Sequence, residues 1–193
     1  MPSHDIHLKY ATLFLRSRRV IPDKSKVRFV DLLIDDPKSH APKIQELVRS
    51  NFNLWLCIAQ ELSPHDLYML LKILPTLGHD VLTQRFSPKR TSWSRSMISY
   101  LRQLIGCIFG REYGLLVDLH VLLDMAEKWC CDDELLRDWG REVGISPEIL
   151  DYYAKHRALI DYDLNCTIRL KQGKCSRRDV ARWLRFNEST EST

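Results

Sequence analysis

The chain has 193 residues, of which 45% are hydrophobic and 28% are charged, and its formal net charge is +4. This length and apolar fraction suffice for one or two folded domains, so a wholly disordered chain is not expected. No apolar stretch approaches the ~20 residues that a membrane-spanning helix needs, and the first residues lack the basic and apolar regions of a secretory signal. We therefore expect a globular protein that is located in the cytoplasm or the nucleus and does not contact a membrane.

Charge is distributed unevenly along the chain. Residues 1–118 hold 17 basic against 11 acidic side chains, whereas residues 119–193 hold 12 basic against 14 acidic ones. The first part thus has a net charge of +6 and the second part of -2. This asymmetry indicates two modules with different partners, and a basic first module is also compatible with binding to nucleic acid.

Helical periodicity runs through the first part of the chain. Apolar residues at helical spacing predict helices over 5–19, 27–34, 44–48, 54–62, 64–74 and 93–108. The segment 27–34 also fits a strand, and we choose a helix. Ser63 and Pro64 form a cap followed by a proline at the first helical position, which marks a helix start. Residues 87–92 are polar and rich in turn formers, which predicts an exposed loop.

The last third of the chain carries the clearest helical pattern. An amphipathic helix is predicted over 119–129, and Asp132 caps another that ends before Gly144. Ser146 and Pro147 repeat the cap-then-proline start. Residues 161–171 alternate as in a strand but also fit a helix, which we choose because no partner strand is apparent. A final helix over 176–184 precedes a disordered tail at 188–193, so the predicted fold class is all-α.

The cysteines and histidines give no metal-binding spacing. The six cysteines occupy mostly apolar, periodic segments, where a free thiol behaves as a small hydrophobe, so we expect free thiols. A metal site could draw on His120, His156 and the cysteines after folding, but no spacing requires one, and we predict no metal and no cofactor. His4 and His7 lie in polar surroundings in the sequence, and His156 is expected at a helix end.

Catalytic motifs are also missing from the sequence. The chain has no GxSxG, no HExxH and no glycine-rich phosphate loop, and it contains only seven glycines. The acidic pairs at 35–36 and 132–133 have the character of cap or loop residues. We therefore predict no catalytic residues and a protein that is not an enzyme.

Residues 136–146, LRDWGREVGIS, resemble the second-helix segment of death domains. The predicted helices before and after this segment follow the order and spacing of a death domain over residues 119–187. The resemblance implies a six-helix bundle that binds another death-domain protein. Residues 51–118 look like a death effector domain, on the basis of residues 61–67 and 101–105, although the interval 75–93 is too short for two full helices. Residues 1–50 have no counterpart and form a helical region of uncertain assignment.

An effector-like module that precedes a death domain is similar to the Fas-associated death domain family of adaptors. The resemblance implies two small helical bundles of the death-fold type and a non-enzymatic adaptor in apoptosis or innate immunity. The second half would bind a death-domain receptor or adaptor, and the first half a caspase or another effector-domain protein, with possible homo-oligomers. The implied protein-binding residues are Arg137, Arg141, Glu142, Lys155, His156, Arg157, Asp66 and Arg111.

Two alternatives to the adaptor remain open. The basic residues between 16 and 28 could contact phosphates, which would make the chain a helical nucleic-acid-binding protein. Solvated surface charge is the commoner reason for such a run, so nucleic acid is the weaker prediction. A virus-encoded regulatory protein with the same basic half is the other alternative.

Overall fold

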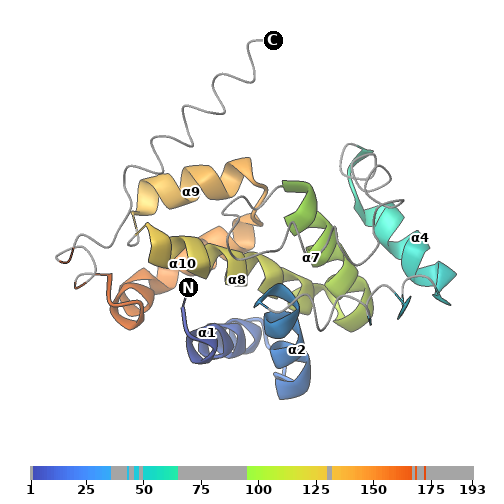
Figure 1. Ribbon diagram of the computed structural model, residues 1–193, viewed down its shortest axis with the longest axis horizontal. Helices are drawn as coiled ribbons and strands as arrows, with labels where there is room; N and C mark the ends of the chain where they lie inside the picture. The colour runs from blue at the N-terminus through green and yellow to red at the C-terminus, as the bar shows by residue number, and fades with distance from the viewer. Residues whose placement is uncertain are drawn as a thin grey trace, which may run out of the picture.

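The protein is described here by a computed structural model that defines residues 2–35, 50–64, 95–129 and 132–166, together with 43, 46, 47, 168 and 172 (Figure 1). These residues form helices and no strand, which confirms the predicted all-α class. The helices are α1 (His4–Ser17), α2 (Lys24–Asp35), α4 (Phe52–Glu61), α7 (Arg95–Phe109), α8 (Arg111–Lys128), α9 (Asp133–Glu142) and α10 (Pro147–Asp163).

Helix α8 is the centre of the described fold. All residues from 113 to 127 except Asp124 are buried, and α8 contacts α1, α2, α7, α9 and α10. Figure 1 shows α8 running through the middle, with α1 and α2 on one side and α9 on the other. A helix that is buried on all sides belongs inside a domain rather than on its surface. The other helices therefore pack around α8 as a common scaffold.

The predicted division of the chain between residues 118 and 119 falls in the middle of α8. Helices from both sides of this point contact α8, and the buried hydrophobic residues on both sides belong to one core. The arrangement as two separate bundles is not confirmed. Experiments on this protein consequently need the full chain, because a cut at this point would divide the central helix.

Helix α8 starts eight residues earlier than the helix predicted at 119, directly after α7. Gly110 joins the two helices with a φ of 102°, a conformation that favours glycine. Gly114 lies where α7 and α8 approach most closely, since an added Cβ would stand 2.4 Å from the carbonyl oxygen of Arg102. In the sequence, Gly110 and Gly106 predict a weak end of the helix over 93–108. In the structure, Gly110 and Gly114 permit a tight junction between α7 and α8.

The predicted start and end of α9 and the predicted start of α10 agree with the structure. The side chain of Asp132 accepts from the backbone amide of Leu135 at the start of α9. Gly144 has a φ of 76° just after α9, and Pro147 occupies the first turn of α10. The helix α10 then continues to Asp163, so the segment predicted as a separate helix from 161 begins as the end of α10.

The expectation of free thiols is wrong for three cysteines. Cys57 on α4 and Cys107 on α7 form a disulfide with their Cα atoms 6.3 Å apart, and Cys166 is also disulfide-bonded. The contact between α4 and α7 brings Cys57 and Cys107 together across 50 residues of sequence, a pairing that local spacing does not reveal. The cysteines at 130, 131 and 175 lie outside the described residues.

None of the described helices is both long enough and apolar enough to cross a membrane.

Candidate metal centre

Six side chains of the types that bind metals lie close together where α1, α2 and α8 meet. Each helix contributes two residues, separated by three or four positions, and this spacing puts both on the same helix face. We call this set the histidine–aspartate cluster. Its members are His4 and His7 of α1, Asp31 and Asp35 of α2, and His120 and Asp124 of α8.

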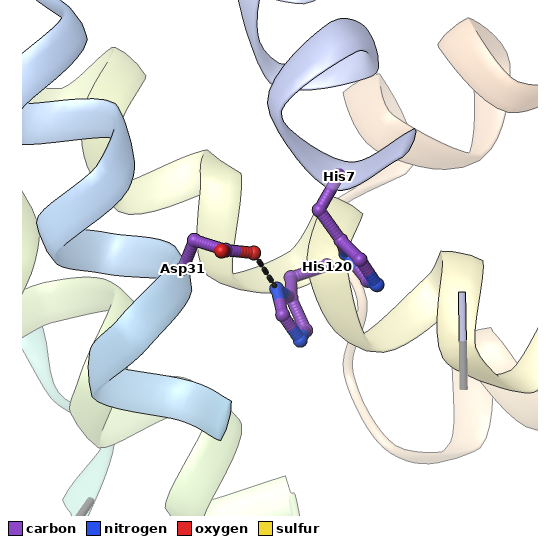
Figure 2. A group of neighbouring side chains, drawn as sticks. All are labelled: His7, Asp31 and His120. Carbon is purple, nitrogen blue, oxygen red and sulfur yellow. Dashed lines mark ion pairs between the residues drawn. The ribbon is translucent and has the colours of Figure 1, made fainter. Parts of the chain in front are cut away.

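The inner part of the cluster is almost completely buried. The side chains of His7, Asp31 and His120 are 3%, 5% and 4% exposed, respectively. Figure 2 shows the rings of His7 and His120 side by side, with Asp31 directed at His120. The ring centroids lie 3.8 Å apart. A cavity of about 10 Å³ is lined by these three residues and by apolar side chains of α1, α2 and α8, close to the space that one water molecule requires.

His120 is surrounded by carboxylates. Its Nδ1 lies 3.2 Å from Oδ1 of Asp31, and its Nε2 lies 3.1 Å from Oδ1 of Asp35 and 3.7 Å from Oδ2 of Asp124. At the outer edge, Nδ1 of His4 lies 2.6 Å from Oδ2 of Asp31 and 3.4 Å from Oδ2 of Asp35. The aspartates of α2 thus connect the histidine of α8 with the exposed histidine of α1.

His7 is less completely paired than His120. Its Nδ1 has no hydrogen-bond partner, and its Nε2 meets one carboxylate oxygen, Oδ1 of Asp124, at 3.3 Å. An unpaired polar group in a protein interior costs about 1–3 kcal/mol. The buried His7 ring is therefore incompletely paired as long as no ligand is bound.

The electrostatics of the two buried histidines point in opposite directions. Burial, and then the charge of His120, lower the pKa of His7 against the opposing effect of Asp124 and Asp31. Burial alone would lower the pKa of His120 as well, but the carboxylates of Asp31, Asp35 and Asp124 outweigh it and raise this pKa to about 10. Without a metal, the cluster therefore contains a charged His120 and a neutral His7.

The aspartates of α2 stay charged in this environment. Burial raises the pKa of both Asp31 and Asp35, but the hydrogen bond and the charge of His120 outweigh that effect and hold each pKa below its usual value. Negative carboxylates and the neutral imidazole of His7 are in the protonation states that a metal ion requires of its ligands, whereas His120 must lose its proton before it can bind a metal.

The distances between the ligand atoms suit a metal ion after a small contraction. Three overlapping groups have ligand atoms within 4.8 Å of one another. In a tetrahedral site with bonds of about 2.0–2.1 Å, ligand atoms lie roughly 3.3 Å apart, so side chains would move by about 1 Å. The groups are His7, Asp31 and His120; His4, Asp31 and Asp35; and Asp35, His120 and Asp124.

The predicted protein-binding residues of α9 lie at its surface or partly so. Arg141 and Glu142 are exposed, and Arg137 is half-buried. Arg141 forms an ion pair with Asp138, one turn earlier on the same helix, with 3.1 Å between Nη1 and Oδ1. An ion pair between residues three apart stabilises many surface helices, so the pair of Arg141 with Asp138 does not by itself indicate a binding site.

Most of the predicted protein-binding residues outside α9 form ion pairs or hydrogen bonds within the chain. Arg157 pairs with Asp133 of α9 and Asp161 of α10, and Arg111 pairs with Glu112 and Glu148, whereas Lys155 is exposed. His156 is half-buried inside α10 and not at a helix end as predicted, with its Nδ1 2.9 Å from the carbonyl oxygen of Tyr152. Asp66 lies outside the described residues.

Sequence reasoning missed most of the cluster. It placed His7 in polar surroundings and Asp35 in a cap or loop, whereas His7 is buried and Asp35 ends α2 beside His120. The available signal was the recurrence of ligand-type residues at i and i+3 or i+4 in three helices. That signal names the candidates but gives no indication that the three helices meet.

No protein-family model, no curated protein and no solved structure matches this chain. The resemblance to death-fold adaptors therefore stays a prediction from the sequence.

Proposed function

We propose that this protein binds a divalent transition-metal ion between α1, α2 and α8. The observation that carries the proposal is His7, a buried imidazole beside His120 and Asp31 whose Nδ1 has no partner and whose Nε2 faces a carboxylate of Asp124. A metal ion would take up one of these nitrogen atoms and would neutralise the carboxylates that surround it.

A buried ion-pair network is the main competing explanation of the cluster. Such a network accounts for charged His120 between the aspartates, because opposite charges compensate one another's loss of water. It does not account for His7, whose imidazole adds a neutral, incompletely paired group to the same place. Metal-binding histidines commonly use one nitrogen for the metal and the other for a carboxylate, an arrangement open to His120.

The chemistry of the donor set selects the class of ion. Imidazole nitrogen suits zinc, iron and related first-row ions, whereas magnesium and calcium prefer oxygen ligands throughout. Two histidines and one carboxylate is a ligand set found with both zinc and non-haem iron(II). We therefore expect Zn²⁺ and Fe²⁺ to bind, and Mg²⁺ to bind far more weakly.

Isothermal titration of the full chain with Zn²⁺, and with Fe²⁺ under anaerobic conditions, tests this proposal. Replacement of His7 by leucine should weaken zinc binding by at least about 100-fold, since a direct ligand matters no less than its supporting residues. His156→Leu is the matched control, because this histidine lies on α10 beside Tyr152 and outside the cluster. Equal zinc affinity of His7→Leu and wild type would overturn the proposal.

The adaptor function inferred from the sequence is the second candidate, and one feature of α9 favours it. Leu136, Trp139 and Val143 are buried as the resemblance implies, while Arg141 and Glu142 stay exposed on the same helix. We propose that this exposed face contacts a death-domain protein and that the first half of the chain contacts a caspase or effector-domain protein.

Capture of a purified death-domain protein by the full chain tests this second proposal. Arg141→Glu should reduce capture at least about tenfold, because a reversed charge repels an acidic partner surface. Arg16→Glu on α1 is the control, since Arg16 is also exposed. Unchanged capture by Arg141→Glu would remove this residue from the interface. Capture of RNA that weakens steeply with salt would favour the nucleic-acid alternative.

A further inference from the structure

The two aspartates of α2 each face two histidines. Oδ1 of Asp31 lies 3.2 Å from His120, and its Oδ2 lies 2.6 Å from His4. Asp35 repeats this pattern, with Oδ1 3.1 Å from His120 and Oδ2 3.4 Å from His4. Each carboxylate thus directs one oxygen toward His120 and the other toward His4, as a carboxylate does when it bridges two metal ions. The inner oxygens meet different ring nitrogens of His120, Nδ1 for Asp31 and Nε2 for Asp35, so the inner side chains must shift for both oxygens to reach one ion.

The histidines define two positions at different depths. The inner position lies at His7 and His120, which are 3% and 4% exposed, and it also includes Asp124. The outer position lies at His4, whose side chain is 55% exposed. The aspartates of α2 lie between them, and the ligand groups of the inner and outer positions overlap only through these aspartates.

The number and charge of the donors exceed what one ion uses. Three imidazoles and three carboxylates offer more donor atoms than the four to six that a first-row ion takes. With neutral histidines the three carboxylates have a charge of -3, which a single divalent ion leaves uncompensated. Two divalent ions together with one hydroxide or similar anion bring this buried charge to zero, as a weakly hydrated interior requires.

We propose that the histidine–aspartate cluster binds two divalent ions, which Asp31 and Asp35 bridge. The inner ion is held by the buried histidines and Asp124, and the outer ion by His4 and by water. This inference rests on the proposed metal-binding function and extends it from one ion to two. Since His4 is exposed, the outer ion is the one that exchanges with solvent and that external ligands can reach.

Metal content and electron paramagnetic resonance of the full chain test the two-ion arrangement. After dialysis against buffered free Zn²⁺, the wild type should retain two ions per chain and His4→Ala one ion. The affinity of the remaining ion should fall by no more than about 100-fold, because that is the usual upper range for loss of a residue that supports a metal ligand. His156→Ala is the control and should retain two ions.

The outcomes separate the two proposals. One ion in both the wild type and His4→Ala would overturn the two-ion arrangement and leave the single-ion function standing. No retained ion in the wild type would overturn both. With Mn²⁺ in place of zinc, bridging carboxylates should give an exchange-coupled resonance that His4→Ala converts to the signal of an isolated ion. Two uncoupled Mn²⁺ ions would overturn the bridging role of the aspartates.

Discussion

Helix α8 carries two buried polar sites only two residues apart, and their composition is opposite. At one site, Nη1 of Arg102 lies 2.6 Å from Oδ2 of Asp118 and 2.9 Å from the carbonyl oxygen of Gly144. The same carboxylate oxygen accepts from the amide of Ser146 at 2.7 Å. At the other site, His120 faces three carboxylates and a second histidine that is incompletely paired.

The difference shows why burial alone does not identify a binding site. Arg102 supplies only donors and cannot ligate a metal, so its pairing with Asp118 serves to hold α7, α8 and the start of α10 together. In the histidine–aspartate cluster, acceptors outnumber donors, and Nδ1 of His7 has no partner. At the first site the Arg102 guanidinium already compensates the carboxylate through Oδ2, although Oδ1 of Asp118 is buried without a hydrogen-bond partner. The second site has three carboxylates and would gain from a cation.

The largest effect is expected from removal of the carboxylate at the first site. Asp118→Ala should lower the free energy of unfolding by about 3–5 kcal/mol, since it leaves Arg102 without its buried partner. Burial raises the pKa of Asp118 to about 6, against the effects of Arg102 and the Ser146 amide, so the group is charged at neutral pH. Urea unfolding of the full chain, followed by circular dichroism, measures the loss.

The contrast between the two sites requires that this variant still binds zinc within a few-fold of wild type under conditions where it is folded. Asp118→Asn is the matched control and should lose less stability than Asp118→Ala, because its amide oxygen can still accept from Ser146 and from Arg102. A loss of zinc binding in folded Asp118→Asn would show that the two sites are not independent.

A smaller effect is expected from pH above 7, where the second site and not Asp118 of the first site changes its protonation state. In the metal-free protein the pKa of His120 is raised from 6.5 to about 10, so the folded state binds more protons than the unfolded state between these values. The stabilisation is complete below the lower value and is lost as pH rises toward the upper one. We expect a decrease of about 1 kcal/mol for each pH unit between roughly 7 and 9.

Urea unfolding with a chelator present measures this slope, and His120→Gln should flatten it. The lowered pKa values of Asp31 and Asp35 add no slope in this range, because both groups are charged in both states. Saturation with Zn²⁺ should also abolish the slope, since the metal displaces the proton from His120. An equal slope in His120→Gln would assign the pH dependence to other groups.

Much of the fold followed from local patterns, and the exceptions have a common cause. Asp132, Pro147 and Gly144 mark helix limits through interactions with nearby backbone, so the sequence reveals them. The start of α8 was missed because the helix is buried on nearly every side, so it has no clear amphipathic face that shows where it begins. Gly114 gave no such local signal, because its role, the close approach of α7, depends on a contact between two helices.

The candidate site was harder to predict from the sequence because it depends on contacts between segments that are distant in the sequence. His4 meets Asp31 across 27 residues, and His120 meets Asp35 across 85. Helical spacing places each pair of ligand-type residues on one face of its own helix, but it does not specify which faces pack together. The exposure of Arg141 and Glu142 on α9 could be predicted for the opposite reason, since it follows from the amphipathic pattern of a single helix.

The smallest change in stability, and the sharpest separation of the two sites, is expected from His7→Leu. The leucine removes an imidazole that is 3% exposed and incompletely paired, and it replaces it with an apolar group of similar size. Since removal of an unsatisfied buried polar group is neutral or favourable, the metal-free variant should be as stable as wild type or more stable by about 1 kcal/mol. With saturating Zn²⁺ the order should reverse, because only wild type gains the free energy of metal binding. Thermal melts of both proteins, with chelator and with Zn²⁺, check this reversal. If His7→Leu is strongly destabilised without metal, then His7 supports the fold as Asp118 does, and the contrast between the two sites of α8 disappears.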